Sequence, residues 1–130
     1  MQCIIVTPER TVRDEPADFV ALTLFDGEIG IAPKHTPLIG RLGYGEMRIK
    51  QGERTASLYV EGGFVEVAGD VVSVLTPRAV PLRELDEAVA EEQLRSALTK
   101  AAKSAEAVAV RDRLVAQSRA QLHVARRAER

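Results

Sequence analysis

A glycine-rich stretch with one histidine is the first place in this sequence where chemistry could occur. Residues 26–49 read DGEIGIAPKHTPLIGRLGYGEMRI, with glycines at 27, 30, 40, 43 and 45 and with His35 among them. Glycine-rich loops can wrap phosphate groups, and a histidine can act as a general base near neutral pH. The stretch therefore raises two hypotheses: a nucleotide-binding or catalytic site, or a set of turns that shape a docking surface.

The spacing of these residues favours turns over catalysis. Gly40-x-x-Gly43-x-Gly45 is not the dinucleotide fingerprint, and no phosphate-loop pattern occurs in the chain. No serine or cysteine lies in a nucleophile-elbow pattern, and a metal site needs about three or four ligands, whereas the histidines are His35 and His123. We therefore expect no catalytic residue, no metal and no cofactor, and we interpret His35 as a hydrogen-bonded loop residue.

Composition narrows the class of protein. The chain has 130 residues, of which 45% are hydrophobic and 28% charged, with a net charge of −1 and no tryptophan. A nucleic-acid or membrane-surface binder would carry a basic excess, so we expect neither function. The single cysteine, Cys3, is interpreted as a small buried hydrophobe on a strand. Since no signal peptide or spanning segment is recognisable, we expect a cytosolic location, or membrane association only through partners.

The chain changes character near residue 82. The nine glycines and six prolines all precede residue 82, and alanine becomes common after it. Residues 1–81 hold 8 basic and 11 acidic residues, whereas residues 82–130 hold 10 and 8. Because glycine and proline mark turns and alanine favours helix, we predict a β domain over residues 1–82 and a helical domain over residues 83–130.

Short strands fill the first domain. The segments QCIIVT, DFVALTLF, EMRIKQ, TASLYVEG, FVEVAG and DVVSVLT are rich in β-branched and aromatic residues, and turn residues separate them. ASLYVEG and DVVSVLT alternate polar and apolar residues, as strands with one buried face do. This pattern predicts a β-sandwich or a barrel.

Two helices are predicted in the second domain. The first runs from about residue 86 to residue 103, with Asp86 as its N-cap, acidic residues in its first turns, and Lys100 and Lys103 at its end. Ser104 is the expected cap of the second helix, which runs over about residues 105–127. Its apolar face comprises Val108, Leu114, Val115, Leu122 and Ala125. A tight connection would make the helices an antiparallel hairpin whose thin apolar face permits movement.

Arginines give the second helix a basic surface. They are Arg111, Arg113, Arg119, Arg126, Arg127 and Arg130. This surface is either an ordinary solvated face or a docking site for an acidic protein partner. Nucleic acid fits less well, because the first helix is acidic and aromatic residues do not alternate with the arginines.

Several motifs in order resemble one family, the ε subunit of bacterial F-type ATP synthase. The matching segments are GEIGIAPKHTPL at 27–38, LGYGEMRI at 42–49, GGFVEV at 62–67 and VSVL at 72–75. The resemblance covers nearly the whole chain. It implies a β-sandwich of about ten strands with a C-terminal antiparallel helical hairpin. This agrees with the two domains predicted above from the residues.

The resemblance also implies a role. Family members are non-catalytic parts of the central rotor stalk that bind the γ subunit and the c-ring and couple proton flow to ATP synthesis. They are peripheral proteins at the cytoplasmic face of the bacterial inner membrane, held there through the complex. The hairpin can fold back or extend along γ toward the α/β catalytic head, where it blocks ATP hydrolysis.

Partner contacts are carried over for a few residues. By resemblance, Glu28 lies near the polar loops of the c-ring, and His35 lies at the same end of the sandwich. Arg119, Arg126 and Arg127 match, in kind only, the basic positions that meet acidic loops of the catalytic subunits.

One family motif is incomplete here. Some members bind ATP through a motif that reads [IL]-D-x-x-R-A at the first helix, and this chain has LDEAVA at 85–90. Asp86 is kept, but Val89 replaces the arginine, and valine cannot donate hydrogen bonds to a phosphate. We therefore expect weak ATP binding or none.

Two other classes of function stay open from the sequence. One is a free-standing adaptor or ligand-binding module that reuses a sandwich. The other is an enzyme that uses His35.

Overall fold

The computed structural model describes residues 1–99 and 105–128, and the side chains of Ala105, Arg127 and Ala128 are outside that description. The chain divides into two compact units, Met1–Pro81 and Leu82–Arg130. The division therefore falls one residue before the boundary expected from composition.

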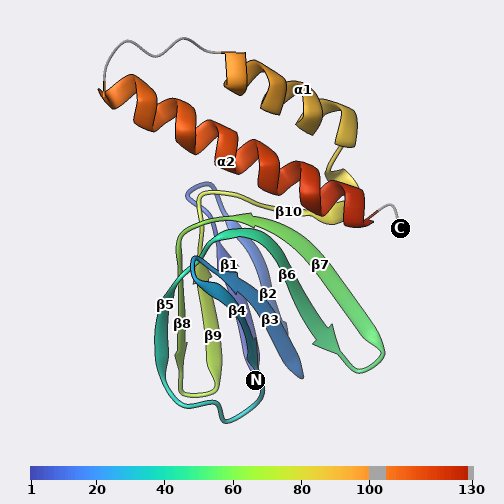
Figure 1. Cartoon of the computed structure of the whole chain (residues 1–130). Helices are drawn as coiled ribbons and strands as arrows, with labels where there is room; N and C mark the ends of the chain where they lie inside the picture. The colour runs from blue at the N-terminus through green and yellow to red at the C-terminus, as the bar shows by residue number, and fades with distance from the viewer. Residues whose placement is uncertain (100–104, 129–130) are drawn as a thin grey trace. The chain divides into compact units, whose positions relative to one another are not determined.

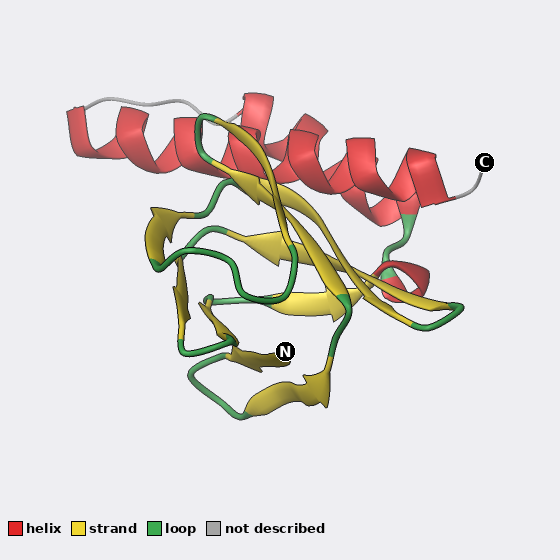
Figure 2. Ribbon diagram, turned by 90° about the horizontal axis from the view of Figure 1, so that it is seen from below, coloured by secondary structure: helices red, strands yellow, loops and turns green. Residues whose placement is uncertain are grey.

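The first unit is a β-sandwich, as predicted (Figures 1 and 2). Its two five-stranded sheets have the orders β2-β1-β9-β8-β5 and β10-β7-β6-β3-β4. The strands are β1 (Gln2–Val6), β2 (Thr11–Pro16), β3 (Phe19–Leu24), β4 (Gly27–Ile31), β5 (Leu38–Arg41), β6 (Tyr44–Gln51), β7 (Arg54–Glu61), β8 (Phe64–Ala68), β9 (Val71–Leu75) and β10 (Ala79–Pro81). The expected ten short strands are thus confirmed within this fully described unit.

Alternation of side chains along the strands produces the two layers. In β8, Val65 and Val67 are buried while Phe64 and Glu66 are exposed. The neighbouring strand β9 repeats the pattern, and the two strands pair in antiparallel register, Val65 opposite Val74. Because side chains alternate with a period of two, this register places one apolar row in the core and the other row on the outside.

The core lies between the two sheets. Its largest fully buried aliphatic side chains are Ile5, Ile31, Met47, Ile49, Leu58, Val20, Val65, Val72 and Val74. Burial of each such side chain stabilises the fold by about 1.5–3 kcal/mol. β1 runs parallel to β9 and antiparallel to β2, so the N-terminal strand lies inside its sheet. The result is a scaffold with firmly held strands.

A glycine pair between β7 and β8 lets two chain segments approach closely. Gly62 and Gly63 have φ angles of 73° and 99°, which L side chains rarely adopt. A Cβ atom on Gly63 would overlap the carbonyl oxygen of Leu75 on β9. The GG of the GGFVEV motif is therefore required by backbone packing.

The second unit holds a short 3-10 turn, η1 (Leu82–Glu84), and two helices, α1 (Glu87–Thr99) and α2 (Ala105–Ala128). Asp86 caps α1, because its Oδ1 accepts hydrogen bonds from the backbone nitrogens of Ala88 (2.8 Å) and Val89 (3.2 Å). The predicted N-cap is confirmed. The roles expected of Ser104, Lys100 and Lys103 lie outside the described residues.

The two helices pack against each other. Ala90 and Ala97 of α1 are buried, as are Leu122, Val124 and Ala125 of α2. The predicted apolar face of α2 is half-buried or buried along its length. Alanine offers little surface to bury, so these helices contact each other through a narrow apolar stripe. The predicted pair of C-terminal helices is confirmed.

We predict that Gly63→Ala destabilises the sandwich by about 3 kcal/mol or more, because it adds both a steric overlap with β9 and a strained φ angle. Urea unfolding followed by circular dichroism measures the change. Gly52→Ala is the matched control: Gly52 also has a positive φ (60°), but a Cβ there meets no atom within 4 Å. The control should cost only about 1 kcal/mol. Equal losses in the two variants would contradict the role assigned to Gly63.

Candidate partner-binding surfaces

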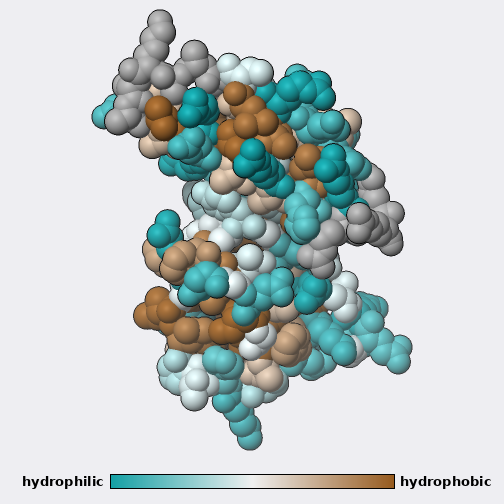
Figure 3. All heavy atoms as spheres, viewed as in Figure 1, coloured by the Kyte–Doolittle hydropathy of each residue, from teal (hydrophilic) through white to brown (hydrophobic). Residues whose placement is uncertain are grey.

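Four large hydrophobic side chains are exposed on the sandwich near one end of the β5–β8–β9 sheet. They are Phe25, Ile39, Phe64 and Leu75, with exposed fractions of 66%, 75%, 57% and 55%. We call them the apolar patch. A space-filling view shows a hydrophobic area over the side of the sandwich where β5 and β8 lie (Figure 3). Isolated exposed hydrophobic residues are common, but a group of four on one surface is typical of a protein-binding site.

Strand register brings the members of the patch together. Phe64 of β8 lies opposite Leu75 of β9 on one side and opposite Arg41 of β5 on the other. Ile39 is two residues before Arg41, so it is a diagonal neighbour of Phe64 on the same outward face. The backbone of this face is held by the ladder bonds of both pairings, so the patch is preorganised.

Phe25 joins the patch from the turn between β3 and β4. Its backbone nitrogen donates a hydrogen bond to the carbonyl oxygen of Arg41 at 3.1 Å. The guanidinium of Arg41 lies 5.5 Å from the centre of the Phe25 ring, in a cation–π arrangement. An arginine beside exposed aromatic rings is the composition that binding hot spots favour.

Glu28 and His35 are both surface residues, but the structure does not bring them together. Glu28 is exposed near the start of β4, beside the turn that holds Phe25. His35 follows β4, in a loop tied to Asp70 through the backbone nitrogen of Lys34. Strand β4 lies between Glu28 and His35 in the chain and runs along the length of the sheet, so the two residues lie at opposite ends of the sandwich. The prediction that they share one end is wrong.

His35 makes local hydrogen bonds. Its backbone nitrogen donates to the carbonyl oxygen of Ala32 at 3.2 Å, and its Nδ1 lies 2.7 Å from the carbonyl oxygen of Thr36. A carbonyl oxygen only accepts, so this geometry places the ring proton on Nδ1. The interpretation of His35 as a hydrogen-bonded loop histidine is confirmed.

Close packing explains two of the glycines of the opening stretch, Gly43 and Gly45. A Cβ on Gly43 would lie 2.8 Å from the carbonyl oxygen of Leu24, and one on Gly45 would lie 2.8 Å from Oγ1 of Thr23. The backbone nitrogen of Gly43 already donates to the carbonyl oxygen of Thr23 at 2.9 Å. Gly43, between β5 and β6, and Gly45, in β6, therefore let this part of the chain lie directly against β3.

The basic residues of α2 form an exposed row. Arg119, His123 and Arg126 are all exposed and follow one another at spacings of four and three, so they lie on one side of the helix. Nε of Arg126 donates a hydrogen bond to Oε1 of Glu87 in α1 at 2.9 Å. Arg127 belongs to α2, but its side chain is outside the described residues. Arg126 thus has a partner within the second unit.

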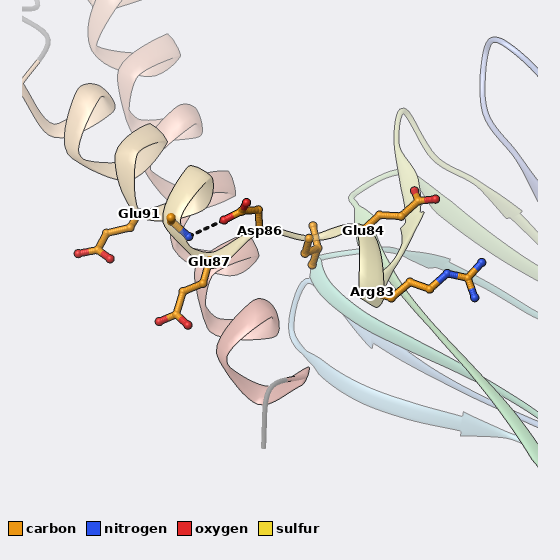
Figure 4. A pocket seen from close by; sticks show the side chains of 7 residues that line it. Arg83, Glu84, Asp86, Glu87 and Glu91 are labelled. Atoms are coloured by element: carbon orange, nitrogen blue, oxygen red, sulfur yellow. Dashed lines mark hydrogen bonds between the residues drawn. The ribbon is translucent and has the colours of Figure 1, made fainter.

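A pocket of about 620 Å³ lies at the start of α1 (Figure 4). Its lining residues are Arg83, Glu84, Leu85, Asp86, Glu87, Ala88 and Glu91. Four carboxylates and one guanidinium give it an acidic lining. Val89, at the position where the ATP motif has arginine, is half-exposed and apolar. The four carboxylates would repel an anionic nucleotide, and Val89 cannot donate a hydrogen bond to its phosphates.

Cys3 is fully buried in the core. Burial raises the pKa of its thiol from 9.0 to about 12, the charge of Glu15 adds to this increase, and Arg13 opposes it. The thiol therefore stays protonated near neutral pH and is a poor nucleophile. The interpretation of Cys3 as a small buried hydrophobe is confirmed.

Two kinds of feature are absent from residues 1–99 and 105–128. No helix there has the length and hydropathy needed to cross a bilayer. In the same part of the chain, no group of three or more His, Cys, Asp or Glu side chains is arranged to hold a metal ion.

Sequence reasoning did not identify the apolar patch. One indication of the patch was present in FVEVAG. Val65 and Val67 are the inward positions of this strand, so Phe64 falls at an outward position, where a polar residue is usual. The outward phase of one strand, however, does not tell which residues of other strands lie beside it. That information comes only from the register of β5, β8 and β9.

Comparisons with known proteins agree on one family. Residues 1–82 match the family model described as ATP synthase, Delta/Epsilon chain, beta-sandwich domain. The ATP synthase epsilon chain of Rhodopirellula baltica is 44% identical over 97% of this chain and 98% of that protein. Chains in two mitochondrial ATP synthase structures share the fold. The one from Euglena gracilis has a TM-score of 0.74 at 23% identity, covering 98% of this chain and 78% of that one; the one from Tetrahymena thermophila has 0.75 at 11% identity, covering 95% of each.

We predict that the purified protein binds ATP weakly or not at all, because the pocket at α1 is acidic and Val89 replaces a phosphate donor. Isothermal titration calorimetry with Mg-ATP should give no saturable heat at micromolar concentrations. Val89→Arg is the gain-of-function comparison, and it should increase any residual affinity. Low-micromolar binding by the unaltered protein would contradict the prediction.

Proposed function

Because the chain belongs to the epsilon-subunit family of ATP synthase, we propose that it is a non-catalytic subunit of the central rotor stalk in a proton-translocating bacterial ATP synthase. In this role it helps to transmit rotation of the c-ring to the catalytic head, and so couples proton flow to ATP synthesis. The fold neighbour from Tetrahymena thermophila, which comes from a structure of a central stalk and c-ring, supports this position by analogy.

The apolar patch is the observation that carries the proposal. A rotor element must hold its neighbour firmly while torque passes through the contact, so it needs a rigid, dehydrated interface. Phe25, Phe64 and Leu75 supply apolar area on a hydrogen-bonded sheet, and Arg41 supplies a polar edge. We assign this patch to the γ subunit.

Glu28 is assigned to the c-ring contact. It is exposed at the start of β4, and its carboxylate can accept hydrogen bonds from polar or basic groups of the ring loops. Gly27, with a φ of 148°, shapes the turn that presents it. His35, at the other end of the sandwich, would then contact a different neighbour or solvent.

The hairpin is proposed to regulate ATP hydrolysis. Its narrow apolar stripe gives α1 and α2 a weak hold on each other, as an element with two packings requires. When extended along γ, the hairpin would bring Arg119, Arg126 and Arg127 to acidic loops of the α/β catalytic head. Inhibition of hydrolysis is the expected consequence.

The proposed location follows from the proposed partners. The protein would lie at the cytoplasmic face of the bacterial inner membrane, as a peripheral component bound only through the ATP synthase. A free-standing adaptor would instead purify without γ and without the hydrolytic complex. Co-purification from membranes therefore separates the two classes of function.

We predict that Phe64→Asp weakens binding of γ by about 30-fold or more, because it places a charge at the centre of a dehydrated contact. Calorimetry with purified γ measures the affinity. Phe64 is exposed, so the variant should keep the circular dichroism spectrum and melting temperature of the unaltered protein.

Thr55→Asp is the matched control for the patch. Thr55 is exposed on β7 in the other sheet, and the substitution adds the same charge away from the patch. It should leave the affinity for γ unchanged. A folded Phe64→Asp protein that binds γ as well as the control does would remove the patch from the γ interface.

We predict that truncation after Pro81 raises ATP hydrolysis by the assembled complex about fivefold or more, because it removes the proposed inhibitory hairpin and leaves the sandwich unit. Steady-state hydrolysis by purified complexes of equal subunit content is the measurement. Unchanged hydrolysis would exclude a role for the hairpin in inhibition.

A further inference from the structure

An ion pair joins the start of α1 to the end of α2. Nε of Arg126 lies 2.9 Å from Oε1 of Glu87, although the two residues are 39 positions apart in the chain. Two further ion pairs of α1 stay within that helix: Arg95 contacts Glu91 and Glu92. The Glu87–Arg126 pair therefore differs in kind, because it bridges the two helices.

The helix termini favour this pair. Glu87 is the first residue of α1, directly after the cap formed by Asp86, and Arg126 is in the last turn of α2. A carboxylate at a helix N-terminus and a guanidinium at a helix C-terminus each complement the local helix dipole. In an antiparallel pair these two ends lie side by side, so the same arrangement that stabilises each helix also places the charges together.

The position of the pair gives it influence over the hairpin. Three of the five buried apolar residues described in the two helices are alanines: Ala90, Ala97 and Ala125, beside Leu122 and Val124. The ion pair adds a charged contact at the joined ends of the helices to the apolar contact between them. A partly exposed ion pair contributes little, but enough to shift the ratio of open to closed molecules a few-fold. Both side chains remain partly exposed, at 31% for Glu87 and 52% for Arg126, so salt will weaken the pair.

We propose that the Glu87–Arg126 ion pair restrains the hairpin from acting as an inhibitor of hydrolysis. The pair holds α1 and α2 together, and it occupies the arginine that an acidic partner surface would bind. Glu87 thus competes intramolecularly with the partner's carboxylates for Arg126. The regulatory consequence of this contact rests on the function proposed above for the extended hairpin.

The first test measures opening of the hairpin in the isolated full-length protein. Spin labels are attached at Gln93→Cys in α1 and Ala116→Cys in α2, both exposed positions, in a Cys3→Ala background. Double electron–electron resonance then gives the distribution of distances between the helices. Glu87→Gln should increase the ratio of open to closed molecules about two- to fivefold, the range expected for a partly exposed ion pair.

Glu91→Gln is the matched control. It removes the same charge one helical turn later, where the carboxylate contacts Arg95 of its own helix. It should leave the open-to-closed ratio unchanged. Raising the salt from 0.1 M to 0.5 M should open the unaltered protein but should have little further effect on Glu87→Gln.

A double-mutant cycle separates the pair from general weakening of the helices. If the two side chains act through each other, Glu87→Gln with Arg126→Gln should be no more open than either single variant. Additive opening in the double variant, or equal opening by Glu87→Gln and Glu91→Gln, would overturn the proposal.

The second test uses the assembled complex and separates failure of the contact from failure of the proposed function. Glu87→Gln should lower ATP hydrolysis about two- to fivefold, since more hairpins are open and Arg126 is released. If Glu87→Gln opens the isolated protein but leaves hydrolysis unchanged, the ion pair stands and the inhibitory function of the hairpin is refuted. If it does not open the isolated protein, the ion pair has no holding role.

Discussion

Packing between the two sheets is the interaction on which the rest of the sandwich depends. Val65, Val72 and Val74 face inward, and because side chains alternate along a strand, their burial also determines which residues face outward. Phe64 and Leu75 are exposed as a direct consequence. The ladder bonds that keep the inner row packed also keep the outer row in place, so a partner meets a preorganised surface and loses little conformational entropy on binding there.

The hairpin, unlike the sandwich, has few large side chains in its interior. Of the five buried apolar residues described in α1 and α2, three are alanines. Both helices also carry exposed charged residues, and an ion pair between Glu87 and Arg126 connects the two helices. A unit held by a narrow apolar stripe and by solvent-screened charges can exchange one packing for another at small cost. The switching proposed for the hairpin requires a unit of this kind.

Local features of the fold were predictable because their causes are local. Glycines and prolines indicated the turns between the strands, and their absence after residue 81 indicated the helical unit. Asp86 was recognisable as a helix cap because it precedes an alanine-rich segment. The motif GGFVEV was also recognisable, although only the structure explains Gly63, whose missing Cβ makes room for the backbone of β9. The positions of the proposed site residues were harder to predict. His35 and Glu28 are near neighbours in sequence, yet β4 places them at opposite ends.

The sequence by itself determined the family, the two-unit organisation, and the kinds of secondary structure, because hydrophobic period, turn residues and motif order act over a few residues at a time. Only the tertiary structure decided which side chains share a surface. Phe25, Ile39, Phe64 and Leu75 come from four separate segments and meet through strand register, and Glu87 meets Arg126 through the packing of two antiparallel helices. Register and helix packing are set by the whole core at once, so no single segment contains them.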